Sequence, residues 1–185
     1  MELSVRGRGD AVATFRFINV HLMETLAGWV PTTPELEVKV LFGRHLWDFA
    51  QHADAFGKRA AELRLQLHAS RAPTAELQGV LDDLRRTTRT AQRLGRLYHG
   101  VVPGVERLYT AYLAQVDELM DEPTVRIIGH GLLDTGRMGR EAESLSAQGG
   151  PSLENGAGST ASGGPFGSLD RVIDFRPAVA AEAEA

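Results

Sequence analysis

The residues best suited to chemistry lie close together between residues 37 and 52 of the chain. Glu37, His45, Asp48 and His52 follow one another at spacings of eight, three and four residues, so on an α-helix they share one face. Carboxylates and imidazoles that project from one helix face into a bundle are the ligands of non-haem metal sites, and these ligand types suit iron, manganese or zinc. The sequence therefore predicts a candidate metal site on this segment.

Residues further along the chain are candidates for completing such a site. They are Glu106, Glu122 and His130, with Asp134 beside them. In this hypothesis the carboxylates supply negative charge, the imidazoles bind as neutral groups, and dioxygen or a small organic substrate enters an open coordination position. The chain would then be a non-haem metal oxidoreductase or a metal-binding protein.

The same helix face has two other interpretations. Apolar residues flank it on both sides, which favours burial, and buried histidines and carboxylates often hydrogen-bond one another or pair with arginines such as Arg44, Arg59, Arg107 and Arg126. Such pairing would satisfy the polar groups without a metal. The third interpretation is a face that is simply solvated.

Length and composition limit the classes of protein. The 185 residues suit one domain, and the absence of cysteine excludes disulfides, thiolate metal sites and cysteine nucleophiles. A net charge of -4 argues against a nucleic-acid binder. No secretory signal and no apolar run of the ~20 residues that a membrane span needs is visible. We therefore expect a soluble, cytoplasmic protein.

Apolar residues at helical spacing predict the elements that position these groups. The pattern predicts helices over 10–29, 35–68, 74–98, 105–119 and 123–143. Pro103 and Gly104 are expected to interrupt or kink the chain between the third and fourth of these. The aromatic residues are expected to be core anchors, and among them are Phe15, Trp29, Phe42, Trp47, Phe49, Phe56 and Tyr98.

The C-terminal part differs in composition from the predicted bundle at 1–147. Residues 148–185 are expected to form a flexible Gly/Ser-rich linker and tail, with a short hydrophobic segment at 165–177. The anchors of that segment are Phe166, Leu169, Val172, Ile173 and Phe175. They predict a segment that docks on a protein partner, and the alternatives are that it packs back on its own bundle or is disordered.

Segments 35–39, 45–48, 52–54 and 121–126 together resemble the ferritin-like superfamily, over roughly residues 10–140. The resemblance implies an antiparallel four-helix core with an extra or kinked helix and, in active members, a di-iron centre that activates dioxygen or oxidises iron. The resemblance implies that active members carry two Glu-x-x-His pairs, one on each of two helices. This chain has none, and His45-x-x-Asp48 reverses the order, so a mononuclear, altered or lost site is expected.

Two functions follow from these observations. The leading hypothesis is a ferritin-like protein with a non-haem iron or manganese site, as an oxidoreductase or a metal-binding protein. The alternative is a non-enzymatic helical interaction or scaffold protein whose C-terminal tail docks a partner. Either protein could form a homo-oligomer.

Overall fold

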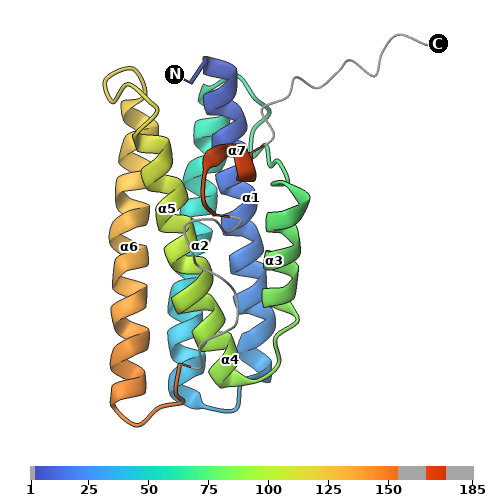
Figure 1. Cartoon of the computed structure of the whole chain (residues 1–185), viewed down its shortest axis with the longest axis vertical. Helices are drawn as coiled ribbons and strands as arrows, with labels where there is room; N and C mark the ends of the chain where they lie inside the picture. Colours follow the sequence, from blue (N-terminus) through green and yellow to red (C-terminus); the bar gives the residue numbers. More distant parts are fainter. Residues whose placement is uncertain (1–2, 154–165, 174–185) are drawn as a thin grey trace, which may run out of the picture.

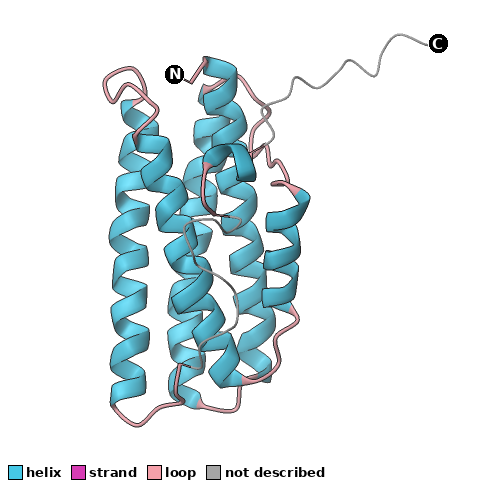
Figure 2. Ribbon diagram, viewed as in Figure 1, coloured by secondary structure: helices cyan, strands magenta, loops and turns pink. Residues whose placement is uncertain are grey.

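The computed structural model describes residues 3–153 and 166–173, which contain helices and no strand (Figure 2). The predicted all-α class is therefore confirmed. In chain order the elements are α1 (Val5–Trp29), the 3₁₀ turn η1 (Val30–Thr32), α2 (Leu36–Glu62), α3 (Ala75–Arg85), α4 (Thr90–Leu94), the π-helix η2 (Gly95–Val101), α5 (Val102–Leu113), α6 (Glu122–Ala147) and α7 (Leu169–Val172).

The long helices lie side by side along the longest axis of the molecule (Figure 1). The most extensive packing is between α1 and α2, which form an antiparallel hairpin. Helix α6 packs on both α2 and α5, and α3 covers another side of α1. None of the described helices is long and apolar enough to cross a lipid bilayer.

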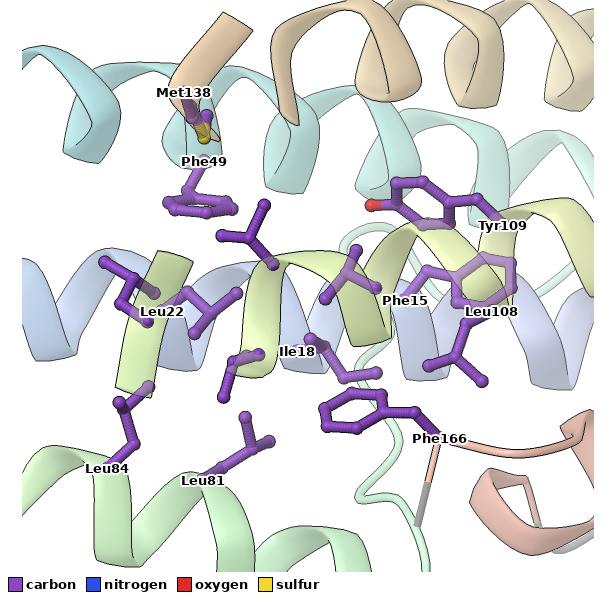
Figure 3. Close-up of a cluster of buried hydrophobic side chains, with 14 of the residues drawn as sticks. Phe15, Ile18, Leu22, Phe49, Leu81, Leu84, Leu108, Tyr109, Met138 and Phe166 are labelled. Carbon is purple, nitrogen blue, oxygen red and sulfur yellow. The ribbon is translucent and has the colours of Figure 1, made fainter. Parts of the chain in front are cut away.

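The core lies between these helices and contains the apolar stripe predicted for the first one (Figure 3). Phe15, Ile18 and Leu22 are at most 1% exposed. The Phe15 ring stands edge-on to the Tyr109 ring, with 5.3 Å between centroids, an arrangement favoured by aromatic quadrupoles. The three-to-four spacing of apolar residues therefore correctly predicted the buried face of α1.

Trp47 is a correction to the predicted core. Its side chain is 63% exposed, whereas Trp29 is 2% exposed and contacts Phe42 as expected. On α2 the buried face is formed by residues such as Phe42 and Phe49, and Trp47 lies on the opposite side of the helix. An apolar residue on the wrong face of an amphipathic helix cannot reach the core.

Helix α2 ends earlier than predicted, at Glu62 rather than near His68. Arg64 and His68 have positive φ angles of 66° and 58°, which stop a right-handed helix. The chain then turns back, and the backbone N–H of His68 donates to the carbonyl of Gly57 at 3.3 Å. A Cβ atom at Gly57 would lie 2.3 Å from Nδ1 of His68, so glycine permits this close approach.

The prediction of a single helix over 74–98 is wrong, because the chain is not helical between the end of α3 and the start of α4. The hydroxyl of Thr87 donates to the carbonyl of Asp83 at 3.2 Å. Arg93 is only 5% exposed, and its guanidinium donates to the Thr87 carbonyl and to the Thr33 hydroxyl, both at 2.9 Å. These contacts hold the break in place through residues distant in sequence, which local periodicity does not report.

Of the interruption or kink predicted at Pro103 and Gly104, the interruption is wrong. Helices α4, η2 and α5 follow one another without a gap, and Pro103 stands in the first turn of α5. A proline inside an α-helix lacks a hydrogen-bond donor and clashes with the preceding turn. The wider π-helical turn just before it, closed by the bond from Val102 N–H to Leu97 O, accommodates the proline.

The C-terminal hydrophobic segment packs on its own bundle. Phe166, Leu169, Val172 and Ile173 are at most 6% exposed and belong to the core cluster (Figure 3). The partner-docking interpretation of these four anchors is corrected accordingly, because their apolar surface is used within the chain. Phe175, the fifth anchor, lies outside the described residues.

Two contacts show how this segment is held. The Phe166 ring lies against Gly104 of α5, where an added Cβ atom would come within 2.5 Å of the ring. Thr74, which precedes α3, donates its backbone N–H to the carbonyl of Val172 at 2.9 Å and its hydroxyl to the carbonyl of Arg171 at 2.5 Å. The segment thus joins α3 and α5.

Candidate functional site

The polar face of α2 lies against α6. His45, Asp48 and His52 are the α2 side chains that make this contact. Their partners on α6 are Asp134, Arg137 and Glu141, which stand three and four residues apart and therefore share one face of that helix. We refer to these six residues, together with Tyr98, as the α2–α6 network.

Arg137 lies at the centre of the network. One of its terminal nitrogens, NH2, donates to Oδ2 of Asp48 at 2.8 Å and to Oδ1 of Asp134 at 3.1 Å. The other, NH1, donates to Oε1 of Glu141 at 3.2 Å. The hydrogen bonds to Asp48 and its neighbours raise the pKa of Arg137 further above its usual range. A single guanidinium therefore neutralises carboxylates from both helices.

His52 forms one end of the network. It is 6% exposed, and its Nε2 lies 2.9 Å from Oδ2 of Asp134. A carboxylate can only accept, so Nε2 carries the hydrogen. Burial raises the pKa of Asp134, but the hydrogen bonds from His52 and Arg137 outweigh that effect and lower it. Nδ1 of His52 is buried and has no hydrogen-bond partner among the described residues.

His45 forms the other end, and it is completely buried. Its Nε2 lies 3.0 Å from Oε2 of Glu141, and its Nδ1 lies 2.6 Å from the hydroxyl of Tyr98. Burial lowers the pKa of His45, and the hydrogen bond and charge of Glu141 offset this only in part. In the neutral ring Nε2–H donates to Glu141, and the Tyr98 hydroxyl donates to Nδ1.

Tyr98 reaches His45 from the π-helix η2. The side chain is 3% exposed, and burial, with the nearby charges of Glu141 and Asp48, raises the pKa of Tyr98 well above its ordinary value. The phenol is therefore the protonated donor. A buried tyrosine hydroxyl normally has a hydrogen-bond partner. A tyrosine expected in the core is therefore the one sequence signal that could have indicated this contact. Single-turn π-helices are rare and often occur at functional sites.

Glu141 connects the network to solvent. Partial burial raises its pKa, but hydrogen bonds from His45, Arg137 and Arg44 outweigh this and lower the pKa to about 2. Arg44 donates to Oε2 at 3.0 Å. Beside Glu141 and Arg44 the surface is hollowed into an open pocket of about 300 Å³, which Glu37 also lines.

The remaining predicted ligands do not join the network, and this corrects the predicted site. Glu37 is exposed at the pocket rim. Glu106 lies half-buried on α5, outside the network, and His130 is exposed on α6. Glu122 is exposed and pairs with Arg126 at 2.6 Å. All four lie on other turns or faces of their helices. Asp134 and Glu141 are the residues that lie opposite His52 and His45.

The carboxylates of the network are paired with arginine. Within residues 3–153 and 166–173, no group of three or more histidine, aspartate or glutamate side chains is placed to hold one. The carboxylates of Asp48, Asp134 and Glu141 instead accept from the Arg137 guanidinium, which occupies the space between them. Comparison with known proteins found no matching family model, curated protein or solved structure. The interpretation therefore depends on the geometry of the network.

The network predicts a loss of stability in acid. Because the pKa of Glu141 is about 2 when folded and 4.5 ordinarily, its contribution is complete above pH 4.5 and is lost between pH 4.5 and 2. The pKa of His45 is also lowered when folded, so the unfolded chain binds a proton first as pH falls below 6.5. We expect the urea midpoint to decline below pH 6.5 and more steeply below pH 4.5.

The control for this prediction is a Glu141→Gln variant studied by circular dichroism over the same pH range. It should start less stable at pH 7 and lose less stability than the unmodified chain between pH 4.5 and 2. Equal losses in the two proteins would show that Glu141 does not have a lowered pKa in the folded state.

Proposed function

We propose that this chain is a non-enzymatic helical interaction protein, built on a ferritin-like bundle in which Arg137 stands where active members hold metal. One observation carries the proposal. The Arg137 guanidinium bonds to Asp48, Asp134 and Glu141, which are the carboxylates between the facing helices.

The ferritin-like part of the proposal has two supports. Long antiparallel helices pack along one axis, as in the bundle that the sequence resembles (Figure 1). Histidines and carboxylates from two facing helices also meet between them at helical spacing, for example His45 with Glu141 and His52 with Asp134. These are the residue types and the location at which such bundles build metal sites.

Arginine changes the chemistry of that location. A guanidinium stays protonated at any physiological pH, and its fixed geometry matches several carboxylate oxygens at once. A divalent cation that needs those oxygens must expel Arg137 and break three charge-assisted hydrogen bonds. The network therefore supports a structural role, in which it ties α2 to α6, better than it supports metal binding.

A second chemical role for the network is a proton relay. Tyr98, His45 and Glu141 form a chain of hydroxyl, imidazole and carboxylate, which is the arrangement that activates a nucleophile in hydrolases. A nucleophile must reach its substrate, however, and the Tyr98 and His45 side chains are 3% and 0% exposed. The chain of hydrogen bonds therefore orients buried groups and is closed to a substrate.

Exposed apolar side chains support an interaction function. Leu36, Val40 and Trp47, which lie on one face of α2, are each more than half exposed. Large apolar residues that gather on a surface mark binding sites more often than chance. The partner-binding surface is therefore proposed on the helices, while the segment 166–173 serves the bundle's own core.

Elemental analysis tests this proposal. The full chain, expressed in medium supplemented with iron and manganese, should contain far less than one metal ion per chain, because Arg137 already neutralises the carboxylates. A double His45→Ala/His52→Ala variant is the matched control and should have the same low content. One or two ions per chain that disappear in the variant would overturn the proposal and restore the non-haem metal hypothesis.

A further inference from the structure

We propose that α2 is the interface of a homodimer, in which it packs antiparallel against α2 of a second copy. The inference rests on the proposed interaction function and names its partner. It comes from the exposed stripe of α2, which consists of Leu36, Val40, Gly43 and Trp47. Nothing described in the chain covers this stripe, and the three large side chains are 68%, 54% and 63% exposed.

The spacing of the stripe is that of a helix–helix seam. Its members are separated by four, three and four residues, which places them within about 60° of one another around the helix. This is the a/d spacing at which one helix packs against another. The stripe lies opposite the buried face of α2, so it is available to a second molecule while the core stays intact.

Gly43 gives the stripe its shape. An added Cβ atom at Gly43 would meet nothing within 4 Å, so the helix surface there is open. Val40 and Trp47 stand on either side of it. Because glycine has no side chain, the surface at Gly43 is recessed between its larger neighbours. A side chain from a facing helix can fill this recess, as knobs fill holes between packed helices.

One antiparallel register matches the stripe to itself. When Trp47 of each copy lies beside Leu36 of the other, the same two-fold axis sets Val40 of each copy over Gly43 of the other. In an antiparallel pair of helices, residues lie opposite each other when their residue numbers have a constant sum. The two pairs have the same sum, so a single register satisfies both. Such an isologous contact closes on itself and uses the same patch in both copies.

Charge complementarity in this register identifies a second copy as the occupant. Glu37 and Arg44 are both exposed, and they lie within about 20° of each other on the flank of the stripe that faces α6. A two-fold axis across the seam brings the same flanks together, so Glu37 of each copy approaches Arg44 of the other. Two opposite-charge pairs then border the apolar seam.

The interface would also adjoin the α2–α6 network. Arg44 donates to Glu141 at 3.0 Å, and both residues line the 300 Å³ pocket with Glu37. In the dimer Arg44 therefore lies between its own Glu141 and Glu37 of the other copy. Reversal of the charge at Arg44 alone would disturb both contacts, so a test of the dimer needs compensating changes.

Sedimentation velocity of the full chain over a wide concentration range tests the dimer. We expect a reversible monomer–dimer equilibrium whose Kd rises about tenfold or more in a Trp47→Glu variant, because a central aromatic residue dominates such seams. Leu133→Glu is the matched control, since Leu133 is 72% exposed on α6, and it should leave the Kd unchanged. Trp47 fluorescence should shift to shorter wavelength as the dimer forms.

The charge pairs provide an independent check. Glu37→Arg and Arg44→Glu should each weaken the dimer, and the double variant should recover most of the lost affinity. A chain that is monomeric at every concentration, or a dimer unaffected by Trp47→Glu, or a double variant without recovery would each overturn the proposal. The metal content of the same samples separates this proposal from the proposed function. A chain that is monomeric and contains no metal would refute only the dimer. A dimer that contains stoichiometric metal would refute only the proposal that Arg137 takes the place of a metal ion.

Discussion

An Arg137→Met variant should unfold with a free energy about 2–3 kcal/mol lower than that of the unmodified chain at pH 7. Loss of one partner from a fully buried ion pair costs about 3–5 kcal/mol, because the other charge stays desolvated. The cost here should be smaller, since Arg137 is 33% exposed and Glu141 26% exposed. Methionine keeps an unbranched apolar stem, so the change mainly removes the charge and its hydrogen bonds.

Arg126→Met is the matched control on the same helix. Arg126 pairs with Glu122 in the i,i+4 arrangement, and both side chains are more than half exposed, so its loss should cost about 0.5 kcal/mol or less. Urea unfolding followed by circular dichroism measures both. If the two variants are destabilised equally, then Arg137 has no special role between α2 and α6.

A Phe166→Ala variant should lower the free energy of unfolding by about 3 kcal/mol, at the low end of values for a buried phenylalanine because the segment is short. Phe166 is 6% exposed and lies against Gly104 of α5. Its loss should also release the segment 166–173, so limited proteolysis there should become faster. Both effects follow from the position of the ring inside the core (Figure 3).

Asp170→Ala is the control for this prediction, because Asp170 lies in the same segment and is exposed. It should unfold at nearly the same urea concentration as the unmodified chain. If Phe166→Ala leaves stability and proteolysis unchanged, the segment does not pack on the bundle in solution, and the partner-docking interpretation of the tail becomes the better one.

The parts of the fold that follow local rules were predictable from the sequence. The stripe through Phe15, Ile18 and Leu22 is buried because apolar spacing alone determines which face of a helix meets a core. The break before α4 was not predictable, because it depends on Arg93 bonding to Thr33, sixty residues away. The π-helix before Pro103 was not predicted either, and with it the helical chain continues through the proline where an interruption was expected.

The candidate site was predictable on one helix only. His45, Asp48 and His52 share a face because of their spacing, and that face lies against another helix as expected. The sequence does not tell which helix lies opposite or in what register. Asp134 was among the candidate ligands, but Arg137 and Glu141 were not, although the spacing of these three residues on α6 carries the same helical signal.

Manganese binding by the full chain and by an Arg137→Ala variant, measured side by side by equilibrium dialysis, tests most directly whether Arg137 takes the place of a metal ion. We predict that the unmodified chain binds no stoichiometric Mn²⁺. The variant, in which the carboxylates of Asp48, Asp134 and Glu141 have lost their guanidinium partner, should bind more of it. Stoichiometric binding by the unmodified chain, equal in the variant and lost on His45→Ala/His52→Ala, would contradict this account.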